Sequence, residues 1–102
     1  MGINIHWEDE RGEQLSQLLD PGHLVRRFLP PFDATDFPCL RFVDPAGDTV
    51  FNQAQITQII SELERLSAGR HDPEVRRHLQ VALEFVRRAA GKVHTYIKFY
   101  GD

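Results

Sequence analysis

Apolar and polar residues alternate at both ends of the chain. Residues 3–8 place Ile3, Ile5 and Trp7 at every second position, and residues 93–100 show the same alternation around Ile97 and Phe99. Successive side chains of a strand point to opposite faces of its sheet, so this alternation is typical of a strand with one buried face. The sequence therefore predicts a strand at each end of the chain.

Two segments in the second half of the chain have helical spacing. Asn52 with Gln55 three residues later forms a capping-box pattern, which predicts a helix from Gln53 to about residue 69. Asp72 followed by Pro73 predicts the start of a second helix that ends near residue 91. We expect buried stripes on both helices and expect Gln58, Glu62, Glu64 and Arg65 to point away from the core. These stripes are Ile56, Ile59, Ile60, Leu63 and Leu66 in the first helix, and Val75, Leu79, Ala82, Leu83 and Val86 in the second.

The middle of the chain is predicted to contain a β-hairpin. Residues 40–43 are mostly apolar, residues 44–47 (Asp-Pro-Ala-Gly) fit a type I turn, and residues 49–51 return as a second strand. Before it, residues 14–19 indicate a turn of helix, and Asp20-Pro21 indicates the start of another that buries Leu24, Val25 and Phe28. Prolines exclude a long regular element between residues 30 and 38.

Together these elements predict a single α+β domain over residues 1–102. We expect a small sheet of about four strands, including the β-hairpin, with the two main helices packed on one face. A composition of 41% hydrophobic and 26% charged residues is ordinary for a globular chain. The only cysteine, Cys39, cannot form an internal disulfide, and no signal peptide or long apolar span is seen, so we expect a cytoplasmic protein. Arginine outnumbers lysine, which suggests a bacterial origin.

The even-numbered residues of the last strand are the first candidate site. If the odd-numbered residues face the helices, the other face carries a row of polar and aromatic side chains, and we expect one residue of the first strand to lie beside this row. Tyrosine buries a large area and keeps a polar end, which suits contact with another protein. A competing interpretation is that residues 14–37 fold over this face and bury it. The candidate residues are His94, Tyr96, Lys98 and Tyr100, with His6 beside them.

The arginines of the second long helix are an alternative site. Arg76 and Arg87, like Arg77 and Arg88, are eleven residues apart, which returns them nearly to the same side of a helix. Two rows of arginine could contact nucleic acid or an acidic partner. The formal net charge of −3 and Glu84 between the rows argue against nucleic acid, and an ordinary solvated helix face is the simplest interpretation.

No catalytic or cofactor pattern is recognisable in the sequence. The five histidines lack the paired spacing of zinc ligands, Cys39 fits a buried core position, and there is no glycine-rich run for phosphates. We therefore expect no enzyme activity, no cofactor and no bound metal. The sequence predicts a protein-binding domain, such as an adaptor, a regulator or an immunity-like protein. Its partner is expected to be another protein or a second copy of the chain, and not a membrane.

Overall fold

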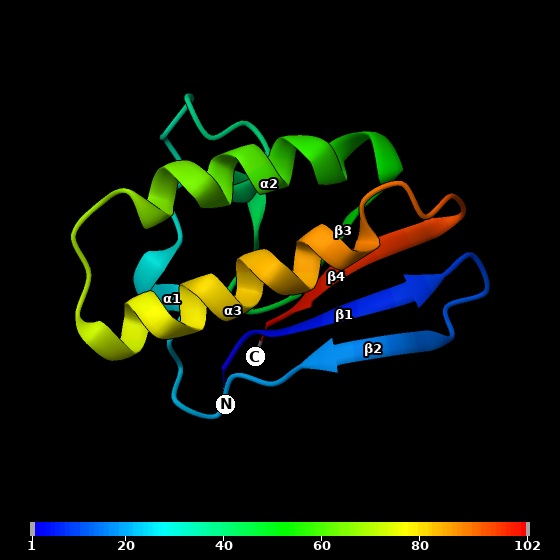
Figure 1. The fold of residues 1–102 in the computed structure, drawn as a ribbon, viewed down its shortest axis with the longest axis horizontal. Helices are drawn as coiled ribbons and strands as arrows, with labels where there is room; N and C mark the ends of the chain where they lie inside the picture. The colour runs from blue at the N-terminus through cyan, green and yellow to red at the C-terminus, as the bar shows by residue number, and fades with distance from the viewer. Residues whose placement is uncertain (1, 102) are drawn as a thin grey trace.

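The first and last strands of the chain pair with each other at the centre of one antiparallel sheet. The computed structural model describes residues 2–101, and its sheet has the strand order β2-β1-β4-β3 (Figure 1). The four strands and two long helices confirm the predicted α+β fold. The elements are β1 (Asn4–Asp9), β2 (Gln14–Leu18), α1 (Val25–Phe28), a 3-10 helix (Leu40–Phe42), β3 (Asp48–Phe51), α2 (Gln53–Ser67), α3 (Pro73–Ala89) and β4 (Thr95–Tyr100).

The register of β1 with β4 brings their apolar residues onto the same face of the sheet. Ile5 lies opposite Phe99, and Trp7 lies opposite Ile97. Ile5, Ile97 and Phe99 are fully buried, and Trp7 packs at the margin of the core. The alternation therefore predicted both strands and their buried face correctly, except at Val93, which was expected on the buried face but precedes β4 and is 70% exposed.

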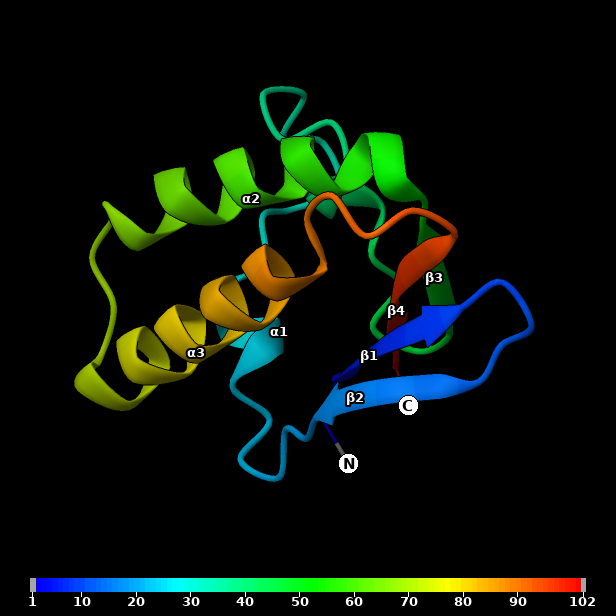
Figure 2. The ribbon, with the colours of Figure 1, turned by 45° about the vertical axis from the view of Figure 1, so that its right-hand side comes forward.

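Helices α2 and α3 cover this apolar face together (Figure 2). The capping box at the start of α2 is confirmed: Asn52 Oδ1 accepts from Gln55 N at 3.1 Å, and Gln55 Oε1 accepts from Asn52 N at 2.9 Å. Gly91 follows α3 with a φ of 76°, a conformation that favours glycine after a helix. The predicted stripe of α3 is entirely buried. In α2, three of the five predicted positions are buried, and Ile60 and Leu66 pack at the core's margin.

The predicted hairpin between residues 40 and 51 is wrong. Residues Leu40–Phe42 form a 3-10 helix, and β3 pairs with β4 instead. The turn at residues 44–47 does form, with Asp44 O accepting from Gly47 N at 3.3 Å, but it docks on the C-terminus through a 2.7 Å hydrogen bond from Gly101 N to Gly47 O. Pairing with β4 places Phe51 against Phe99 in the core, with ring centroids 5.8 Å apart, a contact that a local hairpin would not provide.

The helical turn expected at residues 14–19 is also wrong, because residues 14–18 form β2. The cause is the preceding turn, in which Asp9 N donates to Glu13 O at 2.9 Å and Gly12 adopts a φ of 80°. The Asp9 carboxylate also accepts from Arg11 N and Glu13 N, which closes a tight connection between β1 and β2. The helix expected after Pro21 is present as the short α1, and its Val25 and Phe28 are buried as predicted.

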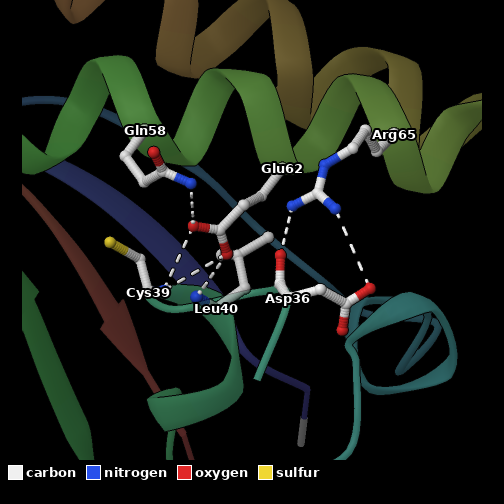
Figure 3. A network of polar contacts seen from close by, with 6 residues as sticks. All are labelled: Asp36, Cys39, Leu40, Gln58, Glu62 and Arg65. Carbon is white, nitrogen blue, oxygen red and sulfur yellow. Dashed lines mark hydrogen bonds and ion pairs between the residues drawn. The ribbon is translucent and has the colours of Figure 1, made fainter. Parts of the chain in front are cut away.

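Glu62 was expected to point away from the core, but it is completely buried. Its carboxylate accepts from Leu40 N at 2.8 Å, from Cys39 N at 3.1 Å and from Gln58 Nε2 at 2.9 Å (Figure 3). Arg65, one turn further along α2, donates to the backbone carbonyl of Asp36. Hydrogen bonds to a buried carboxylate offset the cost of removing it from water. The two side chains therefore fasten residues 36–40 to α2.

We expect Glu62→Gln to lower the free energy of unfolding by about 2–3 kcal/mol, because an uncharged amide accepts weaker hydrogen bonds and only one of its two terminal atoms can accept, whereas both carboxylate oxygens of Glu62 do. Glu64→Gln is the matched control on the same helix, since Glu64 is exposed and solvent screens its ion pair with Arg87, so a smaller loss is expected. Urea unfolding measures both. Equal losses in the two variants would contradict the role of Glu62.

Candidate functional site

The sheet face opposite α2 and α3 carries a group of polar and aromatic side chains. Because Ile97 and Phe99 point toward the helices, the even-numbered residues of β4 point the other way, as do the even-numbered residues of its partner β1. Figures 1 and 2 show both long helices on the other side of the sheet. We call this surface the outer sheet face and define it by His6, Glu8, Tyr96, Lys98 and Tyr100.

Tyr100 is at the centre of the contacts on the outer sheet face. Its hydroxyl donates to Glu8 Oε2, and His6 Nδ1 lies 3.3 Å from the same carboxylate oxygen. The His6 and Tyr100 rings are 4.3 Å apart, and Lys98 Nζ lies 4.7 Å from the centre of the Tyr100 ring. An ammonium at this distance is attracted to an aromatic face. Three side chains from two strands, Glu8 and His6 of β1 and Lys98 of β4, therefore hold Tyr100 in one orientation.

The pKa values of both Tyr100 and Lys98 are raised, although Lys98 itself acts to lower the pKa of Tyr100. Burial raises the pKa of Tyr100, and its hydrogen bond to Glu8 raises it further. Hydrogen bonding with Tyr100 raises the pKa of Lys98. The phenol is therefore neutral and the ammonium charged at neutral pH, so the face presents a hydroxyl, an aromatic ring and one positive charge side by side.

The structure brings most, but not all, of the predicted residues together. His6, Lys98 and Tyr100 are in contact, and Tyr96 lies on the same face. His94 lies outside this group. It precedes β4 with a φ of 61°, its side chain is 74% exposed, and its Nδ1 is 3.5 Å from Glu10 Oε2.

Sequence reasoning did not include Glu8, which is only 7% exposed and receives the Tyr100 hydrogen bond. Glu8 is two residues after His6 on β1 and lies directly opposite Tyr96 on β4. The alternation in residues 3–8 already placed it on this face, but only the pairing of β1 with β4 shows that it meets the tyrosines.

Residues 14–37 do not cover the outer sheet face, which was the competing interpretation of the sequence. Strand β2 extends the sheet at its edge, and α1 packs against α3 on the helix side. Further along, the backbone of Asp36 is held by Arg65 of α2. Val50, which lies opposite Lys98 in the register of β3 with β4, is 53% exposed. This exposure shows that the face reaches solvent at its β3 side.

Both arginines of one predicted row, Arg76 and Arg87, bind other groups of the same molecule. The Arg76 guanidinium donates to the backbone carbonyls of Ser67 at 2.8 Å and Gly69 at 2.7 Å, which fixes the connection between α2 and α3. Arg87 binds the carboxylate of Glu64 at 2.7 Å and so joins α3 to α2. Charges engaged in this way are less able to bind phosphate groups.

The second row, Arg77 and Arg88, remains exposed. Within residues 2–101, neither guanidinium is within 4.0 Å of an acidic side chain. Arg88 donates to Ser16 Oγ at 3.1 Å and lies over the Phe85 ring, with its guanidinium carbon 5.5 Å from the ring centre. The four arginines therefore do not act as one basic surface.

Cys39 has the environment of an unreactive thiol. Burial raises its pKa, and the negative charge of Glu62 and a hydrogen bond to it raise the pKa further. The thiolate is the nucleophilic form of cysteine, so a raised pKa lowers reactivity at neutral pH. In the described part of the chain, no group of three or more histidine, cysteine or acidic residues could hold a metal ion. None of its helices is both long enough and apolar enough to cross a membrane.

Comparison with known proteins identifies no relative. No family model matches the chain, and no curated protein and no solved structure is significantly similar to it.

We expect the tyrosine of the Tyr96→Phe variant to ionise above the usual pKa of about 10, because Tyr100 is then the only tyrosine and its pKa is raised. The absorbance of the phenolate as the pH rises measures this. Adding Glu8→Gln should move the transition to lower pH, because it removes the carboxylate that holds the hydroxyl. A transition that Glu8→Gln leaves in place would contradict the contact.

The raised pKa also makes stability depend on pH, with a defined sign. Folding favours the protonated phenol, so the contribution of Tyr100 is fully present below its unfolded-state pKa and is lost as the pH rises through its folded-state pKa. Adding Tyr100→Phe to the Tyr96→Phe variant should therefore remove the decrease in the free energy of unfolding that the ionisation of Tyr100 causes at high pH.

Proposed function

We propose that this chain is a protein-binding domain without catalytic activity and that it docks its partner on the outer sheet face. The observation that supports the proposal is the arrangement around Tyr100, which Glu8, His6 and Lys98 hold in place on a sheet face without a helix. An adaptor, a regulator or an immunity-like protein would each use such a surface. A cytoplasmic location and a bacterial origin are part of the same proposal.

A surface whose side chains are already fixed loses less conformational entropy on binding than a flexible surface does. Ordering a side chain at an interface costs roughly 0.5–1.5 kcal/mol, and part of this cost is already met where intramolecular contacts fix the side chain. Tyrosine is enriched among the residues that contribute most to binding at interfaces. Tyr100 and Tyr96 therefore have the chemistry of anchors, and Lys98 adds a charge that can select a partner with a complementary group.

Binding of nucleic acid through Arg76, Arg77, Arg87 and Arg88 is the weaker proposal. Affinity for nucleic acid depends on the number of free cationic groups that meet phosphates. Arg76 and Arg87 are engaged within the molecule, which leaves two arginines of the four. A homo-oligomer formed through the outer sheet face is a variant of the favoured proposal, with a second copy as the partner.

We expect affinity capture from a lysate of the source cell to recover a specific protein with the wild type and to lose it with Tyr96→Ala/Tyr100→Ala. The two substitutions remove both aromatic anchors and should weaken binding by about 2 kcal/mol or more for each anchor that is central. Nuclease treatment of a parallel sample separates protein partners from nucleic acid. Circular dichroism and urea unfolding establish that the variant is folded.

The matched control is Phe32→Ala/Phe42→Ala, which also removes two aromatic rings. Phe32 and Phe42 are 69% and 52% exposed, and their rings meet edge to face with centroids 5.6 Å apart; neither residue belongs to the sheet. Capture should survive this control. Equal recovery by the folded tyrosine variant would rule out the outer sheet face, and recovery that disappears with nuclease would favour the arginine helix.

A further inference from the structure

Strand β2 leaves one edge of the sheet open. It is an edge strand with the sequence Gln-Leu-Ser-Gln-Leu, so it carries no charge and no proline along its five residues. In an edge strand, alternate residues direct their N–H and C=O groups away from the sheet. Natural proteins commonly protect such an edge with lysine, proline or a covering element, and β2 has none of these within its own sequence.

A groove of about 460 Å³ lies beside this edge, between β2 and α3. Its apolar part is formed by Leu18 of β2 and by Val81 and Phe85 of α3. Val81 is 45% exposed, although it lies on the helix that carries the largest part of the core. An added strand next to β2 would direct every second side chain toward α3 and into this groove.

Two exposed arginines of α3 line the groove about three helical turns apart. Arg77 and Arg88 both line it, and eleven residues of α-helix separate them by about 16 Å along the axis. The first and last residues of a five-residue extended segment lie about 13 Å apart, and the long arginine and glutamate side chains can span the remaining few ångströms. Glu84 lines the groove as well, but its carboxylate is paired with Arg87 at 2.5 Å.

We propose that the β2 edge binds an extended segment of a partner protein as a fifth strand of the sheet. The segment has an apolar residue at its centre, which enters the groove at Val81 and Phe85. Acidic residues two positions before and two positions after it meet Arg77 and Arg88. Main-chain hydrogen bonds to β2 supply affinity, and the groove and the arginines supply specificity. This surface is separate from the outer sheet face, so each proposal stands or fails independently.

Charge argues against a second copy of this chain as the occupant. Ser16 is the middle residue of β2, and Arg88 donates to its hydroxyl. Antiparallel pairing of two β2 strands around Ser16 would bring the two Arg88 side chains toward each other. Like charges placed together oppose association, whereas a carboxylate at this position favours it.

The test uses the isotope-labelled full chain and a capped peptide with the core Glu-Thr-Val-Thr-Glu, titrated to millimolar concentration and followed by NMR. We expect amide shifts along β2 and in the groove-facing half of α3. Arg77→Glu/Arg88→Glu should weaken binding by roughly tenfold or more and should favour the peptide Lys-Thr-Val-Thr-Lys instead. Arg70→Glu, an exposed arginine in the connection before α3, is the matched control and should leave binding unchanged.

N-methylation of alternate peptide residues tests the strand pairing. One alternating set of amides faces β2 and the other faces solvent, so methylating one set should abolish binding and methylating the other should preserve it. Equal effects of the two sets would overturn the proposal, as would the absence of shifts at the highest peptide concentration or shifts confined to the outer sheet face. A dimer through β2 in sedimentation equilibrium of the chain alone would also overturn it.

Discussion

The pairing of β1 with β4 is the constraint on which the rest of this structure depends. It joins the two ends of the chain at the centre of the sheet, so that Ile5 and Phe99 meet in the core while Glu8 and Tyr100 meet on the opposite face. Glu8 and Tyr100 are 92 residues apart in the sequence. The same register therefore creates both the hydrophobic core and the candidate docking surface, and neither exists until the whole chain has folded.

This central pair also determines which surfaces remain open. With β1 and β4 inside the sheet, β2 and β3 become its edges, and both long helices are needed on the apolar side. Residues 36–40 also lie on the helix side of the sheet, since Glu62 and Arg65 hold them against α2 (Figure 3). The outer sheet face and the β2 edge are consequently left as surfaces where another molecule can bind.

The sequence allowed prediction of the elements whose signals are local. Alternation identified β1 and β4, and the Asn52 capping box identified the start of α2. Failures occurred where a distant contact decides the conformation. Residues 40–42 have a strand-like composition, but the buried carboxylate of Glu62 binds the N–H groups at the start of their 3-10 helix. In the same way, the tyrosine row was visible from alternation, whereas Glu8 became part of the site only through the register between strands.

Site-specific photocrosslinking in the source cell tests most directly whether the outer sheet face binds a partner. A p-benzoylphenylalanine in place of Val50 samples the exposed β3 side of the face, and the same group in place of Phe32 samples an exposed position outside the sheet. We expect one dominant protein adduct from position 50 that is absent from position 32 and is lost when Tyr96→Ala/Tyr100→Ala is added. An adduct that forms equally from both positions, or that survives the loss of both tyrosines, would contradict this expectation.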